Sequence, residues 1–142
     1  MPFAAVPKCI THRLARRLAL LVLDVDGVLT DGGLWFGPRG ETLKRFHVRD
    51  GHGIKLLRAA GIEVAVVSGR KSAAVRTRCR ELGVRLVLQG VDDKSQALDR
   101  LLQRLSLTDT QVACIGDDTT DVPLFVRVGL ADRLHFLPRD LS

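Results

Sequence analysis

Short apolar runs that alternate with amphipathic segments limit this chain to a small number of folds. Each run has the length of a buried β-strand, and the segments between them repeat apolar residues at helical spacing. The runs cover residues 18–23, 62–67, 84–88 and 112–115, with a weaker one at 128–131, and the clearest helical segments are residues 72–82 and 95–106. This alternation predicts an α/β protein built on a parallel sheet.

The segment from about residue 33 to residue 48 does not fit this alternation. It contains two stretches of alternating polarity around a Gly-Pro-Arg-Gly sequence, and Pro and Gly between such stretches are typical of a turn. We therefore predict a β-hairpin inserted after the first strand. Its apolar residues Leu34, Trp35 and Phe36 are expected to be exposed, and a large exposed apolar patch marks an interface.

The length of 142 residues suits one domain and excludes a multidomain enzyme or a full α/β barrel. We place that domain at residues 18–142, after a basic N-terminal segment at residues 1–17. The longest apolar run stops at Asp24 and is too short to cross a membrane, and three scattered cysteines do not suit a disulfide framework. We therefore expect a cytoplasmic protein without a membrane partner.

The formal charge of +6 is concentrated in two segments. Residues 1–17 sum to +4 and residues 70–85 to +5, which leaves −3 for the rest of the chain. In the second segment Arg76 and Arg80 lie opposite the apolar helix face, as on a solvated surface helix. No aromatic residue is present there to stack on bases, so we expect no nucleic-acid partner; salt-dependent DNA association would indicate one.

Polar and acidic side chains gather where the predicted strands end. Ligands of open parallel sheets bind at the carboxyl ends of the strands, so these residues predict a site at that edge. The residues that follow the strands, or open the helix after the third strand, are Asp24 and Asp26, then Ser68, Gly69 and Arg70, then Lys94, and last Asp117, Asp118 and Asp121.

The chemistry of this set favours phosphoryl transfer. Several carboxylates at one place repel one another, and a hard divalent cation such as Mg²⁺ removes that repulsion. Lys94 offers a positive charge to phosphate oxygens, and Ser68 offers a neutral donor together with nearby backbone N–H groups. Asp24 suits a nucleophile because carboxylates form acyl phosphates, and Asp26 suits a general acid and base.

Four ordered motifs resemble those of the haloacid dehalogenase-like (HAD) hydrolase superfamily. They are DVDGVLT at 24–30, Ser68, Lys94 and GDDTTD at 116–121. The chain further resembles the 3-deoxy-D-manno-octulosonate 8-phosphate phosphatase family, through DVDGVLTDGG at 24–33, FHVRDGHGI at 46–54, SGR at 68–70, QG at 89–90 and DK at 93–94. The resemblance implies a three-layer, Rossmann-like parallel sheet (the HAD fold), with the hairpin in place of a cap domain.

The resemblance also implies a reaction and a role for each residue. The reaction is Mg²⁺-dependent hydrolysis of 3-deoxy-D-manno-octulosonate 8-phosphate through an aspartyl phosphate, in lipopolysaccharide biosynthesis. Asp24 is implied as the nucleophile and Asp26 as the general acid and base. The implied metal ligands are Asp24, the backbone carbonyl of Asp26 and Asp117; the implied phosphate and substrate contacts are Ser68, Gly69, Lys94, Arg70 and Arg49; and Asp118 and Asp121 are implied to orient the metal shell or Lys94.

The spacing of the motifs and the resemblance to the family together suggest how the site is closed. No full cap fits between Asp24 and Ser68 or between Ser68 and Lys94, and the resemblance implies a homotetramer whose hairpins close neighbouring sites. The family pattern continues past about Leu130 with a strand, a helix and a Gly-rich tail. The C-terminus is therefore expected to be shorter than that pattern.

The residues alone leave several alternatives open. Arg49 and Asp50 precede a predicted helix, where Asp50 suits an N-cap as well as a substrate role. Arg70 suits either the sugar carboxylate or a solvated helix face, and the hairpin suits either an interface or packing on its own domain. A nine-carbon keto-acid phosphate is an alternative substrate, and a truncated, non-catalytic oligomerisation homologue is an alternative class.

Overall fold

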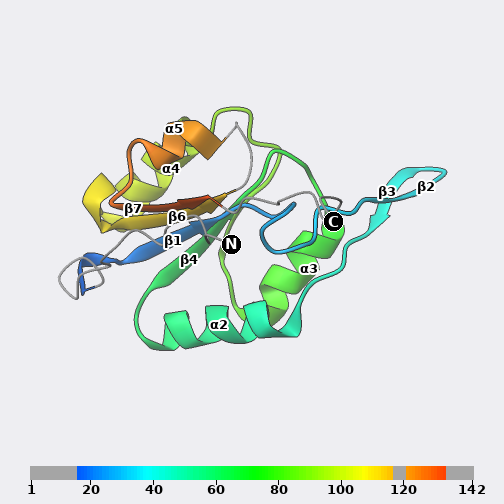
Figure 1. Cartoon of the computed structure of the whole chain (residues 1–142), viewed down its shortest axis with the longest axis horizontal. Helices are drawn as coiled ribbons and strands as arrows, with labels where there is room; N and C mark the ends of the chain where they lie inside the picture. The colour runs from blue at the N-terminus through cyan, green and yellow to red at the C-terminus, as the bar shows by residue number, and fades with distance from the viewer. Residues whose placement is uncertain (1–15, 117–120, 134–142) are drawn as a thin grey trace, which may run out of the picture.

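The computed structural model describes residues 16–116 and 121–133, and its centre is a parallel five-stranded sheet. The strand order is β5-β4-β1-β6-β7. Helices α2 and α3 cover one face of the sheet, and α4 and α5 cover the other (Figure 1). The elements are β1 Leu20–Leu23, β2 Trp35–Gly37, β3 Gly40–Leu43, α2 Val48–Ala59, β4 Glu63–Val67, α3 Ala73–Leu82, β5 Leu86–Leu88, α4 Lys94–Leu105, the 3₁₀ turn η1 Asp109–Gln111, β6 Val112–Gly116, α5 Val122–Phe125 and β7 Leu130–Arg133.

Two apolar cores, one on each face, hold the three layers together. Successive residues of a strand point to opposite faces. In β4, Val64 and Val66 accordingly pack with the α2 and α3 side chains, while Ala65 and Val67 pack with those of α4 and α5. Cys79 is buried in the first of these cores, as the helical pattern predicted. The predicted three-layer α/β fold is confirmed.

The helices that flank the site begin where the sequence pattern placed them, to within one residue. The side chain of Ser72 accepts a hydrogen bond from the N–H of Val75 and caps α3. Asp93 caps α4 in the same way, so Lys94 is the first residue of that helix, as predicted. These caps fix the two helix starts beside the carboxyl ends of β4 and β5.

The hairpin exists but is shorter than predicted. Within the hairpin, the paired strands are β2 and β3, and the chain leaves this pairing after Leu43. The hairpin extends away from the main sheet (Figure 1). Trp35 and Phe36 are exposed on it, as expected.

The expectation that Asp50 could cap α2 is wrong. The helix already begins at Val48, so Arg49 and Asp50 lie inside its first turn. The imidazole of His47 is the cap, because its Nδ1 accepts a hydrogen bond from the N–H of Arg49 at 3.0 Å. An acid inside the first turn still interacts favourably with the helix dipole.

Within the described part of the chain, no helix is long and apolar enough to cross a membrane. The predicted site residues Asp117 and Asp118 lie outside the described residues, as do residues 1–15 of the basic N-terminal segment.

Candidate active site

The centre of the site is the carboxyl end of β1, the middle strand of the sheet. Leu23, its last residue, pairs with Val66 of β4 and with Ile115 of β6. The next residue, Asp24, donates its N–H to the carbonyl of Ile115 at 3.2 Å. Asp24 therefore lies between the ends of two neighbouring strands, where ligands of open parallel sheets bind.

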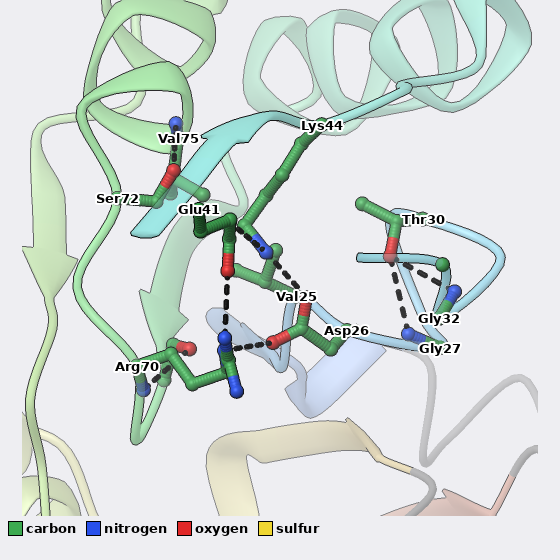
Figure 2. Close-up of polar contacts among 12 residues, drawn as sticks. Val25, Asp26, Gly27, Thr30, Gly32, Glu41, Lys44, Arg70, Ser72 and Val75 are labelled. Atoms are coloured by element: carbon green, nitrogen blue, oxygen red, sulfur yellow. Dashed lines mark hydrogen bonds and ion pairs between the residues drawn. The ribbon is translucent and has the colours of Figure 1, made fainter. Parts of the chain in front are cut away.

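The loop after Asp24 is tightly wound. The carbonyl of Val25 accepts hydrogen bonds from three following N–H groups. The hydroxyl of buried Thr30 accepts from the N–H groups of Gly27 and Gly32, at 3.3 and 3.2 Å (Figure 2). These bonds give the loop a fixed path, so the separation of Asp24 and Asp26 is set by backbone geometry.

Asp24, Lys94 and Asp121 form a buried charged group, brought together from three elements. The Nζ of Lys94 lies 2.6 Å from Oδ1 of Asp121 and 3.3 Å from Oδ1 of Asp24. The side chains of Lys94 and Asp121 are at most 3% exposed. A Cβ at Gly116 would collide with the Asp121 carboxyl group, so glycine at the end of β6 leaves the space that this side chain needs.

Burial sets the protonation behaviour of this group. It raises the pKa of Asp24 to about 6; the negative charge of Asp121 adds to the rise, and Lys94 opposes it. Burial by itself would lower the pKa of Lys94, but the hydrogen bond and charge of Asp121 and the charge of Asp24 raise it overall. Lys94 is therefore a charged lysine held between two carboxylates.

Asp26 faces a second charged group, of which the sequence interpretation named Arg70 but missed Lys44 and Glu41. The Nζ of Lys44 lies 2.6 Å from Oδ1 of Asp26, and the Nε of Arg70 lies 3.7 Å from Oδ2 (Figure 2). Glu41 bridges the two cations, 2.7 Å from Lys44 and 2.8 Å from Arg70. The side chain of Lys44 is only 1% exposed. In the alternating stretch of residues 42–46, Lys44 falls on the same side as Phe46, and this was the one available signal.

Ser68 and Gly69 follow β4 in a loop fixed on both sides. The N–H of buried Ser68 donates to Leu88 at 2.9 Å, and its carbonyl accepts from Val91 at 3.0 Å. Its hydroxyl accepts a hydrogen bond from the N–H of Arg70 at 3.3 Å. These bonds hold the Ser68 hydroxyl at the carboxyl end of β4, next to the end of β1 that carries Asp24.

Arg49 is not brought to this group. It is exposed in the first turn of α2, and its side chain makes no hydrogen bond or ion pair with the described residues. Arg70 does lie beside Asp26, with its guanidinium 6.0 Å above the ring of Phe36 and its side chain partly exposed. The structure therefore brings together Asp24, Asp26, Ser68, Arg70, Lys94 and Asp121.

The donor set suits a hard cation. Among the described residues, no three His, Cys, Asp or Glu side chains form a ready metal cluster. Asp24 nevertheless provides a carboxylate whose charge is disfavoured by burial, and a bound divalent cation would stabilise that charge. Asp117 follows Gly116, the last residue of β6, in the sequence and lies outside the described residues.

No family model matches the chain, but curated proteins and solved structures do. The 3-deoxy-D-manno-octulosonate 8-phosphate phosphatase KdsC of Escherichia coli K12 is 45% identical over 117 residues, which are 82% of this chain and 62% of that protein. The chain therefore spans 62% of the length of the curated relatives that it first matches.

The fold is also similar to that of solved structures. The cobalt-bound form of the deoxy-D-mannose-octulosonate 8-phosphate phosphatase of Haemophilus influenzae matches with a TM-score of 0.80 and 44% identity, covering 83% of this chain and 69% of that one. The phosphatase of Moraxella catarrhalis, in complex with a magnesium ion, a phosphate ion and a KDO molecule, matches with a TM-score of 0.78 and 40% identity, covering 82% and 67%.

The fold also matches a HAD superfamily (subfamily III A) hydrolase of Legionella pneumophila, with a TM-score of 0.80 and 45% identity, covering 84% of this chain and 66% of that one. Together with the buried aspartate after the central strand and its lysine partner, this match places the chain in the HAD superfamily. The identity and coverage narrow this class further. The chain belongs to the 3-deoxy-D-manno-octulosonate 8-phosphate phosphatase family.

Proposed function

We propose that this protein is a Mg²⁺-dependent phosphatase that hydrolyses 3-deoxy-D-manno-octulosonate 8-phosphate to the free sugar acid and phosphate. The observation that carries the proposal is the buried contact of Asp24 with Lys94, in a member of this phosphatase family. A carboxylate nucleophile beside a fixed cation is what attack on a phosphate ester needs.

Asp24 and Asp26 divide the chemistry between them. A carboxylate oxygen of Asp24 attacks phosphorus and forms an aspartyl phosphate while the bond from phosphorus to the sugar oxygen breaks. Asp26 gives its proton to that oxygen, then takes a proton from the water that attacks phosphorus. Phosphate leaves and the Asp24 carboxylate is restored. Lys44 and Arg70, 2.6 and 3.7 Å from the carboxyl oxygens of Asp26, fix the position of its side chain.

Asp24, the backbone carbonyl of Asp26 and Asp117 would hold Mg²⁺, which supplies positive charge that offsets the negative charge of the phosphoryl group. Asp121 fixes Lys94 through the 2.6 Å contact, and Asp118 is assigned to the same supporting set. We assign the phosphoryl group to Ser68, Gly69 and Lys94.

Arg70 and Arg49 are assigned to the sugar acid. Arg70 supports this through its position beside Asp26 and its partly exposed side chain, which can reach a substrate carboxylate. The assignment of Arg49 rests on the family resemblance alone, because Arg49 makes no contact with the site among the described residues.

Assembly and location complete the proposal. We assign a homotetramer formed through the hairpin, because Trp35, Phe36 and Leu43 there are each at least 60% exposed. We also propose a role in lipopolysaccharide biosynthesis, which the name of the family implies, and a cytoplasmic location.

The test is phosphate release from two substrates side by side, 3-deoxy-D-manno-octulosonate 8-phosphate and a nine-carbon keto-acid phosphate, each with and without Mg²⁺. We expect faster release from the octulosonate, only with Mg²⁺. Asp24→Asn should lose at least about a thousandfold in kcat. The matched control is Glu63→Gln, because Glu63 is exposed at the amino end of β4, away from the carboxyl ends of the strands.

Each other outcome is decisive. Equal rates for the two substrates would contradict the octulosonate assignment, and faster release from the nine-carbon substrate would assign that substrate instead. Wild-type release no greater than that of Asp24→Asn would indicate the non-catalytic homologue.

A further inference from the structure

A basic cavity lies at the β5 edge of the sheet and shares none of its lining residues with the acidic site. Its volume is about 690 Å³. It is bounded by the end of α2, one face of α3 and the strand β5. Among the described residues, no acidic side chain lines it and five cationic ones do: Arg58, Lys71, Arg76, Arg80 and Arg85.

Most of these charges are not neutralised within the described residues. Lys71, Arg76, Arg80 and Arg85 are exposed and make no ion pair there. The single acid of α3, Glu81, pairs instead with Arg78, which does not line the cavity. Like charges gathered in a concave surface raise the local potential and attract anions.

Two of the cations lie closely against glycine residues. The Nη1 of Arg58 donates to the carbonyl of Leu82 at 3.4 Å, and the same guanidinium lies where a Cβ on Gly83 would be. The aliphatic stem of Lys71 lies against Gly90 in the same way. Side chains that are already positioned lose less conformational freedom when they bind a ligand.

The lining also limits the chemistry of the ligand. The described lining residues include no aromatic side chain, so they offer no platform for a nucleobase. Gln89 is the only neutral polar side chain among them, and its amide is already engaged with the backbone of Ser72. Recognition there would therefore depend on charge and on guanidinium contacts to oxygen atoms.

We infer that this cavity is a binding site for a small multivalent oxyanion of the polyphosphate class. Arginine forks bind phosphate oxygens in pairs, and several cations around one concave surface favour a ligand with several negative charges over a single phosphate. The inference is independent of the proposed phosphatase activity, because binding can be measured without turnover.

The test is calorimetric titration of the full chain with inorganic tripolyphosphate and, separately, orthophosphate, in the absence of Mg²⁺. The test variant is Arg76→Gln/Arg80→Gln. The matched control is Arg100→Gln/Arg104→Gln on α4, because these arginines are exposed, four residues apart, and outside the cavity. Both variants remove two positive charges, and in each the second arginine lies in the last turn of its helix.

We expect tripolyphosphate to bind more tightly than orthophosphate. The cavity variant should weaken tripolyphosphate binding at least about tenfold, while the control changes it less than about twofold. A second variant, Lys71→Gln/Arg85→Gln, should show the same loss if the first variant folds poorly by circular dichroism.

Four results would overturn the inference. The first two are no binding of tripolyphosphate and an equal loss of binding in the test and control variants. The third is a loss of binding only in Lys94→Gln, which would place the anion in the acidic site. The fourth is displacement of tripolyphosphate by duplex DNA at a lower phosphate concentration, which would favour a nucleic-acid partner.

Discussion

Lys94 has two carboxylate neighbours, and their distances differ. Asp121 is at 2.6 Å and Asp24 at 3.3 Å, so Asp121 is the closer counterion of this buried lysine. Burying a charge costs free energy, which a close partner offsets. Removing the closer partner leaves Lys94 to a carboxylate whose own pKa is raised to about 6, mainly by burial.

Asp121→Asn should therefore lower the free energy of unfolding by about 2–3 kcal/mol at pH 7. Urea unfolding of both proteins measures the difference. Asp99→Asn is the control, because Asp99 pairs with Arg127 at 2.6 Å but its side chain is 63% exposed, and exposed pairs contribute at most about 1 kcal/mol. Equal losses would show that the burial of the Asp121 pair adds nothing.

Glu41 gives a pH dependence whose sign can be stated. Burial raises the pKa of Glu41, but hydrogen bonds and charges from Lys44 and Arg70 lower it more, so the pKa lies below its usual 4.5. The ionised form therefore stabilises the fold above pH 4.5, and this contribution disappears as the pH falls through the lowered pKa.

Glu41→Gln should be less stable than the wild type by about 1 kcal/mol at pH 7, with the difference vanishing in acid. Urea unfolding at several pH values from neutral to acidic measures it. A difference that stays constant across this range would mean that the charge of Glu41 does not contribute.

The sequence predicted the buried group of Asp24, Lys94 and Asp121 better than the charged group around Asp26, which includes Lys44 and Glu41 of the hairpin segment. Asp24 and Lys94 come at the ends of regular elements, whose positions follow from the alternation of strands and helices. Lys44 follows a hairpin strand, and its contact with Asp26 depends on how the hairpin folds back onto the loop after β1. Local pattern does not contain that long-range geometry.

At the scale of elements, one side chain joins α3 to β5. The amide of Gln89 accepts a hydrogen bond from the N–H of Ser72 at 2.7 Å and donates to its carbonyl at 3.2 Å. Gln89 directly follows β5, and Ser72 caps α3. The two bonds therefore fix the start of the helix to the end of the strand, next to the Ser68 loop.

Gln89→Ala should lower the free energy of unfolding by about 1–2 kcal/mol, because two backbone groups lose their partner. Thermal or urea unfolding measures this. Gln96→Ala is the control, since Gln96 is exposed on α4, and should change stability by less than about 0.5 kcal/mol. A neutral Gln89→Ala variant would mean that water replaces both bonds at no cost.

The start of α2 shows why helix boundaries are harder to predict than helices. Asp at a helix start is a common N-cap, and the sequence offers Asp50. The structure uses His47 instead, three residues earlier, and includes Val48 and Arg49 in the helix. Histidine is a weaker signal than aspartate, so the pattern favoured the wrong residue.

For the whole molecule, the exposed hairpin carries the prediction about assembly. Phe36 and Leu43 are 65% and 63% exposed, so they contribute little to the fold of one chain. Phe36→Ser/Leu43→Ser should shift a tetramer to smaller species while leaving the unfolding free energy of the subunit within about 1 kcal/mol. Sedimentation velocity measures the association state.

The control for this change is Leu56→Ser/Val126→Ser, because these residues are similarly exposed but lie on α2 and after α5. It should leave the association state unchanged. A wild-type protein that sediments as a monomer, or a hairpin variant that remains a tetramer, would contradict the assembly through this hairpin.

The short strand β5 has a consequence for solubility. It contains three residues and occupies one edge of the sheet, where unpaired backbone groups can recruit a strand from another molecule. Arg85 immediately precedes β5, and Arg76 and Arg80 line the cavity beside it. Two copies that approached through this edge would bring like charges together. The same arginines that can attract an anion therefore oppose aggregation by strand addition between copies of the chain.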